Sequence, residues 1–196
     1  MALVRAEYII GEYACRGAVI FSNSDTIVSG YINPSIEHHA SIYFGSGIVS
    51  FIAEHRISYP LSGLNDDEKC VIEFNTAGIR VVGLHEFLSS KESVKVYYYT
   101  EACTPAINTM RAAPAFAFED MRKHYGLGKA ASYCFKTIAR CYARVGVEVQ
   151  PVVMFGRKVV LSQSFTLDDR WVRVYDSVTG ISLLPWDGYF EWSSNS

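Results

Sequence analysis

The chain has 196 residues, of which 49% are hydrophobic and 14% aromatic, and its formal net charge is −2. This composition is typical of a globular protein rather than a disordered one, and a chain of this length is expected to form a single domain over residues 1–196. The near-neutral charge provides no broad basic surface, so nucleic acid is not an expected partner.

The five cysteines are scattered along the chain, and no two of them form a Cys-x-x-Cys pair. We therefore expect neither a disulfide framework nor a zinc site, and no cofactor. The N-terminal segment carries Arg5 and Glu7 before any long apolar run, unlike a signal peptide, and no apolar run approaches the ~18 residues of a membrane span. The sequence favours a soluble protein of a reducing compartment such as the cytoplasm.

The first third of the chain predicts a helix followed by strands. Residues 3–14 have the pattern of a short amphipathic helix, and residues 18–21 that of a buried strand. Residues 22–37 are rich in Ser, Asn and Asp, which favours a loop. A strand is expected over residues 37–45, with residues 48–52 as its hairpin partner.

The middle of the chain predicts a polar loop and then an antiparallel sheet. Residues 53–69 are polar and predict a surface insertion. Residues 71–74 and 79–84 are apolar and flank a turn, so they are expected to pair as a hairpin. Residues 85–88 predict one helical turn, and residues 94–99 alternate as in a strand.

The last part of the chain predicts helices and then further strands. Residues 105–125 are Ala-rich and predict a helix. Residues 152–161 and 170–175 predict strands within a C-terminal extension over residues 148–196. The tail from residue 183 carries two Trp and a polar end, which suggests a packed arm.

One helix is expected over residues 132–146, with Ser132 as its N-cap and Gly146 at its C-terminal end. Four residues at spacings of four, three and four share one face of this helix and are expected to point inward. These residues are Cys134, Ile138, Cys141 and Val145.

Cys134 lies in the first turn of this helix, where the partial positive charge of the helix dipole favours the thiolate. A buried, inert cysteine is the ordinary alternative, since free Cys is among the most buried residue types. Cys141 lies two turns further along, without that field, and is expected to be the inert one.

A cysteine nucleophile needs a base and a group that orients the base. His39 opens an apolar strand, and Glu73 interrupts another apolar strand, so the two form a candidate triad with Cys134. Taken singly, each assignment is weak, because a strand Glu usually faces solvent and a lone His is usually a surface or satisfied core residue.

Other motifs carry less weight. The stretch from Gly126 to Ser132 lacks the first glycine of a phosphate-binding loop. The run Tyr97–Tyr99 favours strand packing over base stacking. The histidines have no metal-ligand spacing. They are His38, His39, His55, His85 and His124.

Taken in order, the motifs resemble the circularly permuted NlpC/P60 group of papain-like proteins, and within that group its poxvirus member. The general resemblance covers residues 17–147 and the narrower one continues to about residue 178. The motifs that carry it are His39–Gly45, Val71–Glu73, Gly78–Val81, Leu84–Leu88 and Tyr133-Cys134. The narrower resemblance rests on Asn33–Glu37, Tyr133–Lys136, Leu161–Gln163 and Asp168–Trp171.

The resemblance implies an α+β fold in which a mostly antiparallel sheet packs against the helix that carries the nucleophile. It implies Cys134 as nucleophile, His39 as base and Glu73 as the orienting residue. The chain departs from the pattern at Ser41, where many members have Gly, and in the long insertion over residues 53–69. The first departure is expected to alter the room beside the base, and the second to reshape the substrate cleft.

The family resemblance implies a thiol hydrolase or acyltransferase that acts on an amide or ester bond of a peptide, lipid or acyl group. The alternative is a catalytically silent viral effector that binds a host protein or lipid through the same fold, with peripheral membrane contact. A structural component of the virion is a third, less favoured reading. For a viral protein, the host-cell cytoplasm is the expected location.

Overall fold

The computed structural model describes residues 2–23, 35–101, 104–126, 131–154 and 156–184. Its helices are α1 (Ala2–Tyr13), α3 (Ile48–Glu54), α4 (Leu84–Ser89), α5 (Ile107–Ala112), α6 (Cys134–Ala143) and α7 (Gln163–Thr166), with a 3₁₀ helix η1 (Ala113–Asp120). Its strands are β1 (Val19–Asn23), β2 (His39–Gly45), β3 (Cys70–Asn75), β4 (Gly78–Gly83), β5 (Ser93–Glu101), β6 (Thr104–Pro105), β7 (Val152–Met154), β8 (Arg157–Val159) and β9 (Trp171–Asp176).

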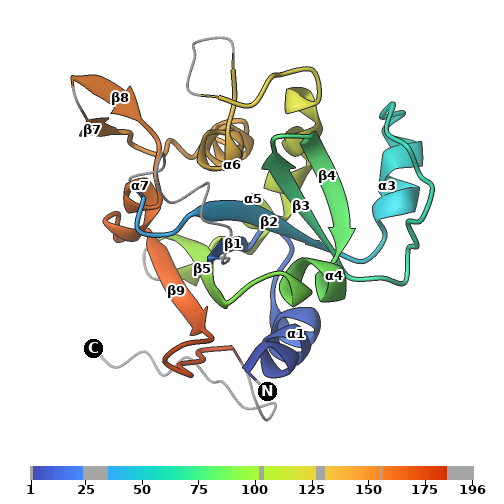
Figure 1. Ribbon diagram of the computed structural model, residues 1–196, viewed down its shortest axis with the longest axis horizontal. Coiled ribbons are helices and arrows are strands. Elements are labelled where there is room, and N and C mark those ends of the chain that lie inside the picture. Colours follow the sequence, from blue (N-terminus) through green and yellow to red (C-terminus); the bar gives the residue numbers. More distant parts are fainter. Residues whose placement is uncertain (1, 24–34, 102–103, 127–130, 155, 185–196) are drawn as a thin grey trace.

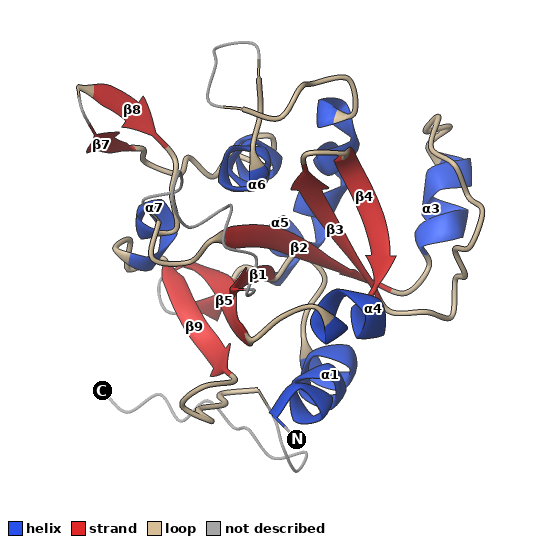
Figure 2. Ribbon diagram, viewed as in Figure 1, coloured by secondary structure: helices blue, strands red, loops and turns tan. Residues whose placement is uncertain are grey.

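Seven of the strands form one antiparallel sheet in the order β4-β3-β2-β1-β5-β6, and β9 also pairs with β5. Figure 1 places α6 above β2, whereas α1 and α4 lie below it. Figure 2 shows the same strands between helices on both sides, with α3 at one edge. The expected α+β fold with a mostly antiparallel sheet is therefore confirmed.

The hydrophobic core lies between the sheet and its helices, and aromatic side chains dominate it. Phe21 of β1 contacts Tyr97, Phe135 and Phe165 at ring-centroid distances of 5.2, 5.8 and 5.5 Å. Each residue of the run Tyr97–Tyr99 is 7% exposed, as strand packing predicts. Burial of aromatic area on this scale is the main stabilising contribution to such a core.

Most of the secondary structure agrees with the sequence analysis, including the β3–β4 hairpin and the one-turn helix α4. The predicted loop over residues 22–37 falls largely outside the described residues, as does the predicted arm beyond residue 184. The predicted extension is integrated into the fold, since β9 pairs with β5 along the sheet. Among the described helices, none is long and apolar enough to cross a membrane.

The prediction that residues 48–52 pair as a strand was wrong, because they form helix α3. Gly47 has φ of +84° and turns the chain away from β2. The carboxylate of Asp66, from the 53–69 segment, accepts hydrogen bonds from the backbone amides of Val49 and Ser50 at 2.7 and 3.0 Å. It therefore caps the helix from a distant part of the sequence.

Two other elements are shorter than predicted. The single helix expected over residues 105–125 is α5 followed by η1, because Pro114 has no N–H to continue the α-helical ladder. The single strand expected over residues 152–161 is the β7–β8 hairpin, which turns at Gly156 with φ of +72°.

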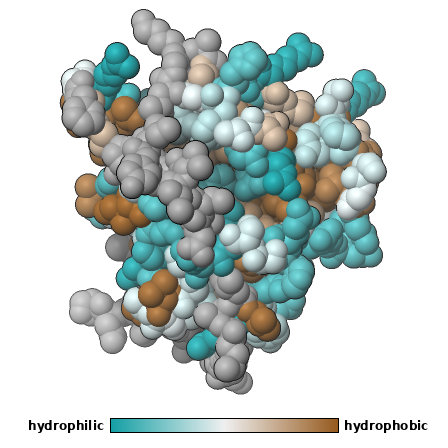
Figure 3. All heavy atoms as spheres, in the orientation of Figure 1, coloured by the Kyte–Doolittle hydropathy of each residue, from teal (hydrophilic) through white to brown (hydrophobic). Residues whose placement is uncertain are grey.

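The described surface is mixed in character. The face in Figure 3 carries hydrophilic side chains over much of its described area, with small separate hydrophobic areas between them. This pattern is ordinary for a protein surface, because scattered apolar side chains are common there.

Candidate active site

His39 is the first residue of β2, and its side chain is 18% exposed. In the β2–β3 ladder Ser41 pairs with Glu73, so His39 lies diagonally across from Glu73 on the same face of the sheet. Nε2 of His39 is 2.9 Å from Oε2 of Glu73. The carboxylate therefore fixes the orientation of the imidazole ring.

The Glu73 carboxylate is itself held by neighbours on the same hairpin. Its Oε1 accepts hydrogen bonds from Asn75 Nδ2 at 3.2 Å and from Arg80 Nη1 at 3.3 Å. Burial alone raises the pKa of Glu73, but the hydrogen bond and charge of His39 and the charges of Lys91 and Arg80 outweigh it and lower the pKa. The carboxylate therefore stays ionised beside the imidazole.

Cys134 is the first residue of α6 and is 1% exposed. The preceding Tyr133 is extended, with φ of −152°, so the helix begins at the cysteine. The thiol interacts with the His39 imidazole and with the backbone amides of Ala40 and Phe135. These donors and the start of the helix all favour a negative charge on the sulfur.

The two ionisable groups shift each other toward their charged forms. Burial tends to lower the pKa of His39, but Cys134 and Glu73 raise it to about 9. Burial tends to raise the pKa of Cys134, but the imidazole and the amides lower it. A thiolate–imidazolium pair is the expected state between the two pKa values.

The other buried thiols, those of Cys70 and Cys141, have raised rather than lowered pKa values. Burial raises the pKa of Cys141, and it raises the pKa of Cys70 to about 11. Cys141 is 0% exposed, so the expectation that it is a packed and inert cysteine agrees with its surroundings. The environment of Cys134 is thus specific to that residue among these thiols.

Sequence analysis missed Asp120, a buried carboxylate at the end of η1 that holds the start of α6. Its Oδ2 accepts hydrogen bonds from Ser132 Oγ at 2.7 Å and Thr137 Oγ1 at 2.9 Å. Its Oδ1 is 2.9 Å from Arg140 Nη1 and 2.5 Å from Lys123 Nζ. The prediction of Ser132 as N-cap was wrong by one residue, because Tyr133 is the N-cap and the Ser132 hydroxyl bonds to Asp120.

Sequence analysis also missed Tyr125, whose hydroxyl interacts with the thiol of Cys134. Its ring stacks on Phe74 at a centroid distance of 5.7 Å, and a β-bridge joins it to Ser132. Burial and the neighbouring thiolate raise the pKa of the phenol, so it remains a neutral hydrogen-bond donor. No spacing pattern singles out Tyr125, because an irregular segment brings it to the site.

Ser41, His55 and His85 make structural contacts rather than contacts with the Cys134 thiol. Ser41 is buried beside the base and donates a hydrogen bond from Oγ to the Ile20 carbonyl at 3.3 Å. His55 stacks on Phe51, and His85 Nδ1 is 2.9 Å from Glu7 Oε2. Within the described ranges, no three His, Cys, Asp or Glu side chains gather in a way that suits a metal ion.

Comparison with solved structures supports the fold. The metalloprotein YiiX from Escherichia coli O157:H7 aligns with a TM-score of 0.59 and 13% identity, over 82% of this chain and 96% of that one. At this level of identity the likeness concerns the fold alone.

Comparison with known sequences identifies relatives in poxviruses. Protein OPG091 of vaccinia virus (strain Copenhagen) is 34% identical over 168 residues, which cover 86% of this chain and 88% of that protein. The monkeypox and variola virus OPG091 proteins are 33% and 32% identical over the same length.

Residues 13–175 match a family described as permuted papain-like amidase enzymes, YaeF/YiiX, C92 family. The sequence resemblance was thus right about the permuted papain-like fold and the poxvirus relatives, but the family that matches is C92 rather than NlpC/P60. The chain belongs to the C92 family of permuted papain-like amidases.

Proposed function

We propose that this chain is a cysteine hydrolase or acyltransferase that acts on an amide or ester bond through an acyl-cysteine intermediate. The observation that carries the proposal is the thiol of Cys134 at the start of α6, beside a His39 imidazole that Glu73 holds at 2.9 Å. A nucleophile, a base and an orienting carboxylate in this relation are the requirements of thiol catalysis. Membership of an amidase family supports the same assignment.

In the first half-reaction the Cys134 thiolate attacks the carbonyl carbon and forms a C–S bond. Backbone amides at the first turn of α6 stabilise the oxyanion, and the Tyr125 hydroxyl lies beside the sulfur. The His39 imidazolium gives its proton to the leaving amine or alkoxide as the C–N or C–O bond breaks.

In the second half-reaction His39 acts as the base. It takes a proton from water, or from the hydroxyl or amine of an acceptor, as that group attacks the thioester. The C–S bond breaks, and the product is a carboxylic acid or a transferred acyl group. The sulfur leaves as the thiolate and the proton taken from the acceptor stays on His39, which restores the thiolate–imidazolium pair.

The biological setting forms part of the same proposal. The poxvirus relatives support a viral protein that modifies a host or viral substrate in the host-cell cytoplasm. The substrate class is a peptide, lipid or other acyl compound that carries an amide or ester bond.

The proposal is tested by the alkylation rate of Cys134 at pH 6. Wild-type protein is expected to react rapidly with iodoacetamide, because the imidazolium holds the sulfur as a thiolate. The His39→Ala variant is expected to react roughly 100-fold more slowly, since only about 0.3% of an ordinary thiol with a pKa of ~8.5 is ionised at this pH. Glu73→Gln, which keeps the size of the side chain, is expected to fall between the two.

Peptide mass spectrometry of the same samples provides internal references, because Cys70 and Cys141 have raised pKa values and stay unmodified. Equal Cys134 rates in wild type and His39→Ala, with both at the level of an ordinary thiol, would remove the basis of the proposal.

A further inference from the structure

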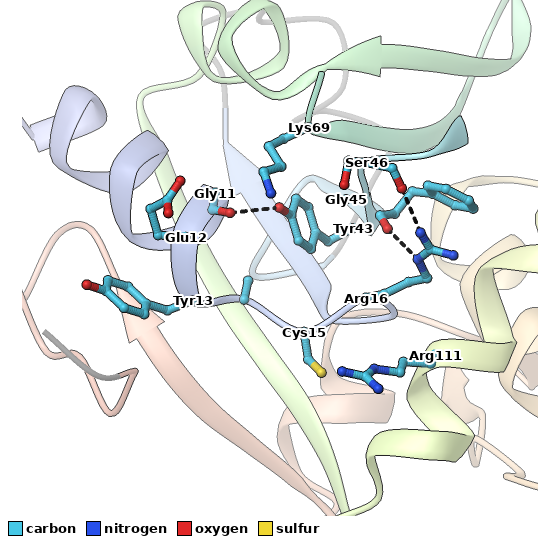
Figure 4. Close-up of a pocket in the computed structure, with 12 residues that line it drawn as sticks. Gly11, Glu12, Tyr13, Cys15, Arg16, Tyr43, Gly45, Ser46, Lys69 and Arg111 are labelled. Atoms are coloured by element: carbon cyan, nitrogen blue, oxygen red, sulfur yellow. Dashed lines mark hydrogen bonds between the residues drawn. The ribbon is translucent and has the colours of Figure 1, made fainter. Parts of the chain in front are cut away.

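A second site of interest is a cavity of about 600 Å³ at the opposite end of β2 from His39. It is lined by residues 11–16, residues 43–46, Lys69 and Arg111 (Figure 4). Tyr43, the β2 residue of its lining nearest to His39, lies four residues along the strand, a distance of about 13 Å at ~3.3 Å per residue. The cavity is therefore separate from the candidate catalytic centre.

The charged side chains of this cavity are mainly cationic. Arg16, Lys69 and Arg111 line it together with one carboxylate, that of Glu12, which leaves an excess of two positive charges. Neither Lys69 nor Arg111 forms an ion pair or a side-chain hydrogen bond with the residues that the structure describes. Neither charge is thus paired directly with a carboxylate of the described chain.

Arg16 is held rigidly in this wall. Its Nε donates to the Phe44 carbonyl at 2.7 Å, and its Nη2 donates to the Ser46 carbonyl at 2.6 Å. The guanidinium also lies 4.0 Å from the centroid of the Phe44 ring. Both partners are backbone carbonyls at the end of β2 and the turn that follows, so the position of the charge is fixed before any ligand arrives.

A tight backbone contact brings Arg111 to the same cavity. Gly17 has φ of +93°, and a Cβ at this position would lie 1.9 Å from the Met110 carbonyl oxygen, so only glycine allows this approach. The contact joins the residue after Arg16 to the residue before Arg111. In Figure 4 Arg111 extends from α5 toward Cys15, and Lys69 lies beside Tyr43.

The electrostatics of Arg16 agree with this arrangement. Burial lowers the pKa of its guanidinium, and the charge of Arg111 lowers it further. Two cationic groups that repel each other across a cavity are stabilised when an anion binds between them.

We propose that this cavity binds the phosphate group of a small ligand. A phosphate monoester carries close to two negative charges at neutral pH, which matches the excess positive charge of the walls. Guanidinium groups donate paired hydrogen bonds to phosphate oxygens, and the lysine ammonium adds a point charge. The inference goes beyond the proposed acyl chemistry and does not depend on it.

The test is isothermal titration calorimetry with inorganic phosphate at constant ionic strength. Wild type is expected to bind phosphate saturably, and Arg111→Gln is expected to weaken binding at least tenfold, because charge-assisted hydrogen bonds are lost. Lys69→Met is a second variant that leaves the partly buried Arg16 untouched. Arg122→Gln removes an exposed cation outside the cavity and is expected to leave the Kd unchanged.

A flotation assay distinguishes a soluble ligand from a lipid headgroup. It compares vesicles of pure phosphatidylcholine with vesicles that also contain phosphatidate. Phosphate binding without flotation supports a soluble phosphate compound, and flotation with phosphatidate that is lost in Arg111→Gln supports a lipid phosphate. Absence of saturable phosphate binding by wild type, or an equal Kd for wild type and Arg111→Gln, overturns the proposal.

Discussion

Replacing the sulfur atom of Cys134 is expected to abolish acyl transfer and leave the fold intact. In Cys134→Ala the rate of hydrolysis of acyl esters and amides should fall at least about 10⁴-fold, because no covalent intermediate forms. The substitution removes one buried atom from a residue that is 1% exposed, so the unfolding temperature should change by only a few degrees. The measurement compares turnover on a panel of aryl esters and acyl amides with thermal unfolding of the same samples.

The matched control for this experiment is Cys15→Ala. Cys15 is half-buried at the far end of the sheet, and its loss should leave turnover unchanged. If Cys134→Ala retained the wild-type rate, the hydrolysis would belong to another group, and the nucleophile assigned here would be wrong.

The largest expected effect on stability comes from Asp120→Ala. The substitution leaves two buried hydroxyls, those of Ser132 and Thr137, and two cations, Lys123 and Arg140, without their shared carboxylate. The free energy of unfolding should fall by about 3 kcal/mol, near the lower end for a broken buried ion pair, since both cations are partly exposed and can rehydrate. Urea denaturation measures this difference.

The adjacent carboxylate provides the control for Asp120. Glu119 is half-exposed and pairs with Arg144 at 3.1 Å on the surface, so Glu119→Ala should change the free energy of unfolding by less than about 1 kcal/mol. Equal losses in the two variants would mean that the Asp120 contacts do not stabilise the start of α6.

The stabilising effect of Asp120 should also depend on pH in a defined direction. Burial raises its pKa, but hydrogen bonds from Lys123, Ser132 and Thr137 and the charge of Arg140 outweigh this and lower it. A lowered folded-state pKa contributes stability above the unfolded value of 3.8, and this contribution is lost as the pH falls through the folded value. The difference in the free energy of unfolding between wild type and Asp120→Ala should therefore become smaller below about pH 4.

Elements with a long, clear pattern were predictable from the sequence. The inward face of α6 follows from the spacing of Cys134, Ile138 and Cys141, whereas Val145, predicted on the same face, lies beyond the helix end at Ala143 and is only partly buried. The β3–β4 hairpin follows from two apolar runs around a turn. The Ile48–Ile52 run was not predictable in the same way, because five residues do not distinguish a strand from a helix. Its cap comes from Asp66, whose contact depends on the folded chain.

The candidate site likewise contains residues that the sequence pattern indicates and residues that it does not. His39 opens one apolar strand and Glu73 interrupts another, so both could be found, and the structure brings them within hydrogen-bonding distance of each other. Asp120 and Tyr125 have no such signal, because each reaches the site from an irregular or 3₁₀ segment. Sequence patterns report regular elements, whereas these contacts depend on how the connections between elements fold.

The central claim is that Cys134 and His39 form a thiolate–imidazolium pair in the free protein. The most direct test is the ultraviolet absorbance of the thiolate as a function of pH, taken as the difference between wild type and Cys134→Ala. The account predicts that the thiolate signal is present well below the ~8.5 at which an ordinary thiol ionises. A single midpoint at or above that value would contradict it.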